Sequence, residues 1–166
     1  MHASHGIVSS RSLMHDAAMN QPTSRVRIPF VEHLGVQLTE QSKERAVGVL
    51  VKRPELLNSW GSTHGGVIMT ILDYVMSAAV RGHYGAEHSI LTVDLSLGFM
   101  NTATTNQLIA EGRVLHSGKS TAFCEAEARD ETGKLLAKAI GTFKLLPLKP
   151  EERRTSPEAT ESSQQT

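Results

Sequence analysis

The residues whose types and spacing could do chemistry lie in one short stretch of the sequence. Asp73 is the only charged residue in the apolar run Gly65–Val80. A carboxylate is costly to bury without partners, and one that faces a cleft can have a shifted pKa and act as a base or a nucleophile. The alternative is a partly exposed aspartate with a local hydrogen-bond partner such as Thr70 or Ser77.

The segment before this aspartate supplies a second candidate group, the start of a helix. Residues Asn58–Gly66 (NSWGSTHGG) lead without a break into the apolar run. The first N–H groups of a helix have no acceptor inside it and lie at the positive end of its dipole. Gly65 and Gly66 would let a ligand approach the backbone, so this end could bind an anion or an oxygen that becomes anionic during a reaction. The alternative is an ordinary helix start capped by Ser62 or Thr63.

The spacing of these two groups has a consequence for assembly. Gly65 and Asp73 are eight residues apart, which is about 12 Å along a helix axis. A reacting carbonyl must lie about 3 Å from its oxyanion donor and close to its base or nucleophile. One subunit cannot bring both groups to one carbonyl, but two antiparallel helices related by a two-fold axis can. We therefore expect an obligate homodimer with two composite sites, and pairing of dimers into a homotetramer.

The surrounding elements must hold this helix in place. Residues 29–38 predict a short helix that stops at Gly35. Alternating apolar residues predict strands, the last four of them in a meander, with glycine-containing hairpins at 116–119 and 130–133. The predicted strands cover 45–52, 91–99, 106–115, 121–129 and 135–145. In the second of them one face is expected to carry Leu91, Val93, Leu95, Leu97 and Phe99.

A helix that is apolar nearly all round is a core helix. The strands 106–115 and 121–129 carry small residues on one face, which would let the helix sit close to them. The sequence therefore predicts an α+β fold, in which a curved antiparallel sheet wraps around one long central helix. At about 24 Å the 16-residue helix is too short to cross a bilayer. We expect one domain over 26–147, a flexible leader over 1–25 and a disordered polar tail over 148–166.

Composition excludes several classes of partner. Lys+Arg and Asp+Glu are 17 each, so the chain has no net field to attract nucleic acid or an anionic membrane. Cys124 is the single cysteine, which excludes an intrachain disulfide and a cysteine-rich zinc site and favours a reducing compartment, the cytoplasm. The eight histidines match no metal-binding motif. We expect no metal and no cofactor.

The pattern Asn58-x-x-Gly61-x-x-His64-Gly65-Gly66 followed by Asp73 resembles the motif of hot-dog-fold acyl-CoA thioesterases, of the PaaI-like, phenylacetic acid degradation type. The resemblance covers residues 29–146 and includes the strand order. It implies the hot-dog fold, a sheet wrapped around a central helix.

The resemblance also implies a role for each residue of the reaction centre. The Asp73 carboxylate is the general base, or the nucleophile, of thioester hydrolysis. The backbone N–H of Gly65 polarises the thioester carbonyl, helped by the side chain of Asn58. His64 supports this loop or the substrate. Thr92 matches a hydroxyl that orients the water in some relatives.

Coenzyme A lies, in some relatives, against the hairpin that matches residues 116–121. The substrate-contacting positions implied by the resemblance are Gly66, Phe99, His116, Gly118, Lys119, Ser120 and Lys144. Lys119 could meet a phosphate as a point charge, while Gly118 lets backbone N–H groups approach it. The alternative for Lys119 and His116 is an ordinary solvated hairpin. Coenzyme A enters here as part of substrate and product.

The sequence thus predicts an acyl-CoA thioesterase that acts on aryl- or medium-chain acyl groups. We expect the acyl pocket to be walled by parts of 29–38, Met69, Val80 and the loop of Trp60. One alternative is a non-catalytic acyl-CoA-binding or sensing protein on the same fold. A second is a hot-dog dehydratase, which would need a histidine paired with an acid for proton transfer.

Overall fold

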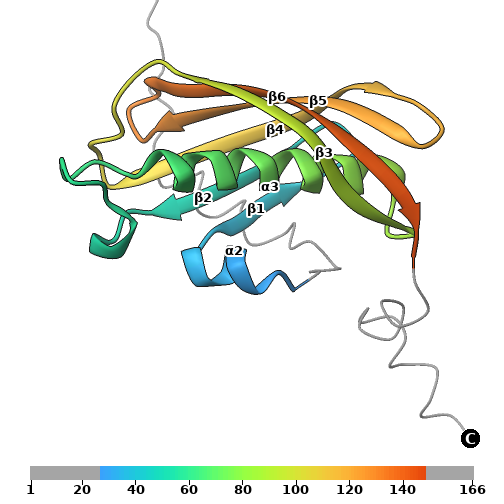
Figure 1. Ribbon diagram of the computed structural model, residues 1–166, viewed down its shortest axis with the longest axis horizontal. Helices are drawn as coiled ribbons and strands as arrows, with labels where there is room; N and C mark the ends of the chain where they lie inside the picture. Colours follow the sequence, from blue (N-terminus) through green and yellow to red (C-terminus); the bar gives the residue numbers. More distant parts are fainter. Residues whose placement is uncertain (1–26, 149–166) are drawn as a thin grey trace, which may run out of the picture.

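The computed structural model describes residues 27–148, in which one long helix lies against one face of an antiparallel sheet (Figure 1). The predicted leader and, apart from Leu148, the predicted tail fall outside these residues. The elements along the chain are α2 (Pro29–Leu34), β1 (Gln37–Gln41), β2 (Ala46–Val51), the 3-10 helix η1 (Pro54–Leu56), α3 (Gly65–Tyr84), β3 (His88–Phe99), β4 (Gln107–Ser117), β5 (Thr121–Asp130) and β6 (Leu135–Pro147). Within residues 27–148, no helix combines the length and apolarity that a membrane span requires.

The sheet confirms the predicted strands but corrects their pairing. Its six strands lie in the order β1-β2-β4-β5-β6-β3, and all neighbours are antiparallel. Only β4, β5 and β6 form a meander, because β3 pairs with β6 at the far edge of the sheet. The prediction of four strands in a meander was therefore wrong. Alternation along a strand shows which face is buried, but it does not identify the neighbouring strand.

The first predicted helix ends where the sequence placed its stop, but the residues after it form a strand. Gly35 ends α2 in the left-handed conformation, with φ 78°, as predicted. The chain then enters β1, whose presence the sequence did not reveal. Leu38, which lies after the predicted stop at Gly35, is the one buried residue of this five-residue strand. A strand with a single buried side chain has too little alternation to be recognised.

Small residues let α3 approach the sheet closely, as predicted. Ala110, Ala122 and Ala126 are buried beneath it. A Cβ added to Gly112 would lie 2.6 Å from the backbone carbonyl carbon of Val75, so only glycine fits there. The same buried face carries Cys124, and burial raises the pKa of its thiol to about 12.

A bulge in β3 changes the predicted faces of that strand. Thr92 pairs with Phe143 and Asp94 with Thr142, so Val93 is an extra residue in the register. A bulge shifts the alternation by one residue. Leu91 and Val93 are consequently 56% and 62% exposed, whereas Leu95 and Leu97 pack against the core. The expectation of one continuous apolar face was wrong for Leu91 and Val93, and the bulge leaves Thr92 on the side of α3.

Candidate active site

Asp73 lies in the middle of α3 and is held by a residue of the neighbouring strand. The hydroxyl of Thr92 donates a hydrogen bond of 2.8 Å to Oδ1 of Asp73. Thr70 and Ser77, the local partners considered from the sequence, donate instead to backbone carbonyls within α3. Partial burial raises the pKa of Asp73, and the bond from Thr92 opposes this rise. A carboxylate with a raised pKa is a stronger base than a free one, as a general base requires.

The amino end of α3 is capped by His64, not by Ser62 or Thr63 as the sequence had suggested. Nδ1 of His64 accepts a hydrogen bond of 2.9 Å from the backbone N–H of Gly66. An Nδ1 that accepts requires the ring proton to be on Nε2 in the neutral imidazole. Ser62 lies two residues before this cap position, and its hydroxyl is bonded to the side chain of Asn58.

The backbone N–H of Gly65 has no acceptor among residues 27–148. It therefore stays available to an oxygen from outside the subunit. The ring of Phe99 lies beside it, since a Cβ added to Gly65 would be 3.1 Å from Cζ of Phe99. The structure thus brings together three of the predicted site residues, Gly65, Gly66 and Phe99, at one end of α3.

Asn58 organises the loop that leads into α3. Its Nδ2 donates to Oγ of Ser62 at 2.8 Å, and its Oδ1 accepts from the backbone N–H of Trp60 at 2.9 Å. The side-chain amide is thus bonded inside its own loop in this subunit. To polarise a carbonyl it would have to exchange Ser62 for the substrate. The sequence suggested Ser62 only as a possible helix cap, and its bond to Asn58 shows only in three dimensions.

The predicted substrate contacts other than Gly66 and Phe99 gather at the opposite end of α3. Nζ of Lys144 donates to Oγ of Ser120 at 3.0 Å. The hydroxyl of Tyr84, the last residue of α3, donates to the carbonyl of Gly118 at 2.8 Å and so ties the hairpin to the helix. This hairpin also carries Lys119, which is exposed, and ends at His116, whose ring lies beside Phe123. Tyr84 is a site residue that the sequence did not indicate.

Two groups of predicted residues therefore lie apart within one subunit. Gly65 and Asp73 share α3 and are separated by eight residues, about 12 Å along its axis. A single subunit does not bring the free N–H and the carboxylate to one carbonyl.

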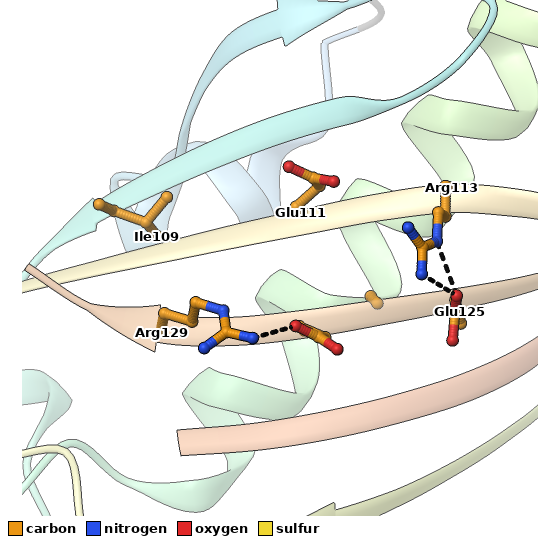
Figure 2. Close-up of a pocket in the computed structure, with 7 residues that line it drawn as sticks. Ile109, Glu111, Arg113, Glu125 and Arg129 are labelled. Carbon is orange, nitrogen blue, oxygen red and sulfur yellow. Dashed lines mark hydrogen bonds and ion pairs between the residues drawn. The ribbon is translucent and has the colours of Figure 1, made fainter. Parts of the chain in front are cut away.

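A separate groove of about 200 Å³ lies on the outer face of the sheet (Figure 2). Its side chains alternate along β4 and β5 with the small residues that face α3. The charged side chains in it pair with one another, as Arg113 does with Glu125 and Arg129 with Glu127. No group of three or more His, Cys, Asp or Glu side chains that could hold a metal occurs within residues 27–148. The groove thus lies on the face of the sheet opposite Asp73, and the expectation of metal-free chemistry stays a prediction.

Comparison with known proteins agrees with this geometry. A model of the thioesterase superfamily matches residues 61–137. A "putative esterase" of Saccharolobus solfataricus is 32% identical over 113 residues, covering 68% of this chain and 80% of that protein. The 1,4-dihydroxy-2-naphthoyl-CoA hydrolase of Listeria monocytogenes is 24% identical, covering 63% and 85%. The PaaI protein of E. coli shares the fold, with a TM-score of 0.66 at 18% identity, covering 82% and 90%. These relatives support thioester hydrolysis as the general activity. The chain belongs to the thioesterase superfamily and has its hot-dog fold.

Proposed function

We propose that the protein is an acyl-CoA thioesterase that hydrolyses aryl- or medium-chain acyl-CoA to the free acid and coenzyme A. The observation that carries the proposal is the Asp73 carboxylate, which is partly buried in an apolar helix and fixed by Thr92. A base held in this way suits an activated ester such as a thioester, whose hydrolysis needs only a positioned water, a base and an oxyanion pocket.

In the proposed reaction the Asp73 carboxylate removes a proton from a water molecule, and the water oxygen attacks the thioester carbonyl. The N–H of Gly65 from the other subunit stabilises the oxyanion of the tetrahedral intermediate. The intermediate collapses with cleavage of the C–S bond, and the protonated Asp73 returns its proton to the leaving thiolate. Because Thr92 occupies Oδ1, the second oxygen is left for water.

The edge strand β3 supports the proposed homodimer. It ends the sheet on one side, and its exposed Leu91 and Val93 lie on that edge strand. An unpaired strand edge with exposed apolar side chains is a template for pairing with another chain. A second copy related by a two-fold axis could pair there and bring the two α3 helices together antiparallel. Pairing of dimers into a tetramer and location in the cytoplasm remain predictions from the sequence.

The composite site can be tested by mixing two defective subunits. Gly65→Pro removes the N–H at the first position of α3, where proline is tolerated, and the extended conformation of His64 suits a following proline. Neither Gly65→Pro nor Asp73→Asn homodimers should hydrolyse acyl-CoA. Heterodimers isolated with two different affinity tags should recover about half of the wild-type activity, because one of their two sites is intact.

Gly65→Ala is the matched control, since it adds a Cβ but keeps the N–H. It should retain activity once the exposed ring of Phe99 has shifted. Heterodimers as inactive as both parents would refute a site shared between two subunits.

Thr92 is expected to set the pH dependence of the reaction. Its hydrogen bond lowers the pKa of Asp73 against the effect of burial. Thr92→Ala removes this bond, so the pKa of Asp73 rises further and the base is lost at a higher pH. The acid limb of the kcat/KM profile should therefore move to higher pH, and Thr92→Ser should restore it. If the acid limb of Thr92→Ala stayed at the wild-type pH, the hydroxyl of Thr92 would have no influence on the group that titrates.

The substrate class is tested with a panel of acyl-CoA thioesters. Aryl-CoA and medium-chain acyl-CoA substrates are compared by thiol release, with crotonyl-CoA hydration as the assay for a dehydratase. The Listeria relative, named for a naphthoyl-CoA substrate, supports including aromatic acyl groups. Tight binding of the panel by calorimetry without thiol release from any member would indicate a binding protein in place of a hydrolase.

A further inference from the structure

We propose that Trp60 of the subunit that supplies Gly65 contacts the coenzyme A arm of the substrate, while the other subunit supplies Asp73 and the phosphate-binding lysines. This inference rests on the proposed thioesterase function and its two-fold dimer. It adds a binding residue that the motif comparison does not include.

Trp60 is presented to solvent by a well-ordered loop. It is 90% exposed, the highest exposure among the large apolar side chains of residues 27–148. The loop around it is closed by a bridge between Leu57 and Thr63 and by the bond that the backbone N–H of Trp60 donates to Oδ1 of Asn58. Gly61 follows with φ 74°, a conformation that favours glycine. The indole is thus held out on a fixed support, although its exposure gives the isolated subunit no hydrophobic stabilisation.

The position of this loop along the helix axis directs it to the coenzyme A side of the site. The segment before α3 lies beyond the amino end of the helix (Figure 1). In the proposed antiparallel pair, Gly65 of one subunit lies beside Asp73 of the other. Tyr84 is eleven residues after Asp73 on α3, so it lies about 16 Å further along the axis. The carboxyl end of the second helix therefore extends past the first helix on the side of the Trp60 loop.

Two lysines lie by that carboxyl end, Lys119 on the hairpin tied to it and Lys144 on β6. The bond from Tyr84 to Gly118 fixes Lys119 near the helix end, and Ser120 is bonded to Lys144. Lysine side chains are suited to bind phosphate as point charges. A coenzyme A arm that runs from the thioester to these lysines must pass the loop of the first subunit. An indole there offers a flat apolar face and one N–H donor, which suit an adenine ring or a pantetheine chain.

Trp60 is the only tryptophan of the chain, so its fluorescence reports this contact directly. Titration of the wild-type protein with free coenzyme A should change its emission with the same Kd that calorimetry gives. Titration with pantetheine and with adenosine 3′,5′-bisphosphate should show which part of the arm reproduces the change. Binding seen by calorimetry without a change in emission would overturn the contact. Absence of coenzyme A binding by calorimetry would instead overturn the proposed function.

Kinetics separate the coenzyme A arm from the acyl group. Trp60→Ala should raise KM for acyl-CoA about tenfold with little change in kcat, as expected for the loss of one stacked aromatic. The same variant should hydrolyse the corresponding acyl-N-acetylcysteamine, which lacks most of the arm, as well as wild type does. Trp60→Phe should recover much of the loss. Ile140→Ala, which truncates a 56% exposed side chain on the sheet, is the matched control and should leave both substrates unaffected.

Equal defects on the two thioesters would assign Trp60 to the acyl pocket and refute the inference. So would a change in the elution volume of Trp60→Ala in size-exclusion chromatography, since it would place the indole in the contact between subunits.

Discussion

Asp73→Asn is expected to lower kcat/KM for acyl-CoA hydrolysis by about 1000-fold, because the amide cannot accept a proton from water. The substitution is nearly isosteric, and the amide oxygen can still accept the hydrogen bond from Thr92. The loss should therefore come from chemistry and not from folding. Steady-state kinetics by thiol release on the best substrate of the panel measures it, and unchanged coenzyme A binding by calorimetry shows that the site is intact.

The same variant has an expected effect on stability, whose sign follows from the pKa. Burial raises the pKa of Asp73 in the folded state, so the folded protein binds this proton more tightly than the unfolded chain does. The contribution of Asp73 to the free energy of unfolding therefore falls as the pH rises from the ordinary carboxyl pKa through the raised one. Asp73→Asn should have a higher Tm than wild type above that window and a similar Tm below it. Full activity in Asp73→Asn, or a lower Tm at neutral pH, would contradict this account of the carboxylate.

Gly112→Ala is expected to lower the free energy of unfolding by about 3 kcal/mol, the upper end of ordinary overpacking. The added Cβ would lie 2.6 Å from the carbonyl carbon and oxygen of Val75 and 2.7 Å from the nitrogen of Met76. These are backbone atoms of α3, which cannot rotate away as a side chain would. The helix must move off the sheet, and its contacts with the buried alanines loosen. Urea denaturation followed by far-UV circular dichroism measures the change, which corresponds to a drop in Tm of roughly 10 °C.

Gly98→Ala is the matched control within the same sheet. A Cβ there would meet only the end of Met100, at 3.8 Å. Its stability should stay close to that of wild type, or rise slightly because the unfolded chain loses freedom. If Gly112→Ala and Gly98→Ala both unfolded at the same urea concentration as wild type, the space between α3 and β4 would be wide enough for a methyl group.

The central packing of the fold was predictable because its pattern is local and strong. The run from Gly65 is apolar on nearly every face, and the strands opposite it alternate small residues with polar ones. A large apolar helix and small strand residues fill the core without cavities only when the helix lies close to the sheet. The helix and the face of β5 that carries Cys124 followed from these two patterns.

The features that the sequence did not reveal depend on long-range pairing. Nothing in residues 88–99 shows that β3 pairs with β6, which follows it by 36 residues. The bulge at Val93 is likewise invisible, because regular alternation continues through it in the sequence. Only the paired register shows that Thr92 and Leu95 share a face. The small strand β1 lacks an alternation strong enough to be read.

The candidate site was predictable as a set of residue types, but its internal contacts were not. The spacing from Asn58 to Asp73 identified the groups and their separation. It did not identify His64 as the residue that caps α3, since serine and threonine are the usual caps. His64, and not Ser62 or Thr63, stands directly before the first helical residue, and its Nδ1 accepts from the backbone N–H of Gly66. The bond from Thr92 to Asp73 required the bulge, and so the structure.

The reactivity of the buried Cys124 thiol reports whether the protein is folded. The only sulfhydryl of the chain is 1% exposed, and burial raises its pKa to about 12. A disulfide reagent added to follow coenzyme A release would therefore find no competing thiolate while the fold is intact. Reaction of one equivalent per chain would instead mark the opening of the layer between α3 and β5. The same thiol reagent can thus measure the rate of thioester hydrolysis by the native protein and the rate at which the protein unfolds.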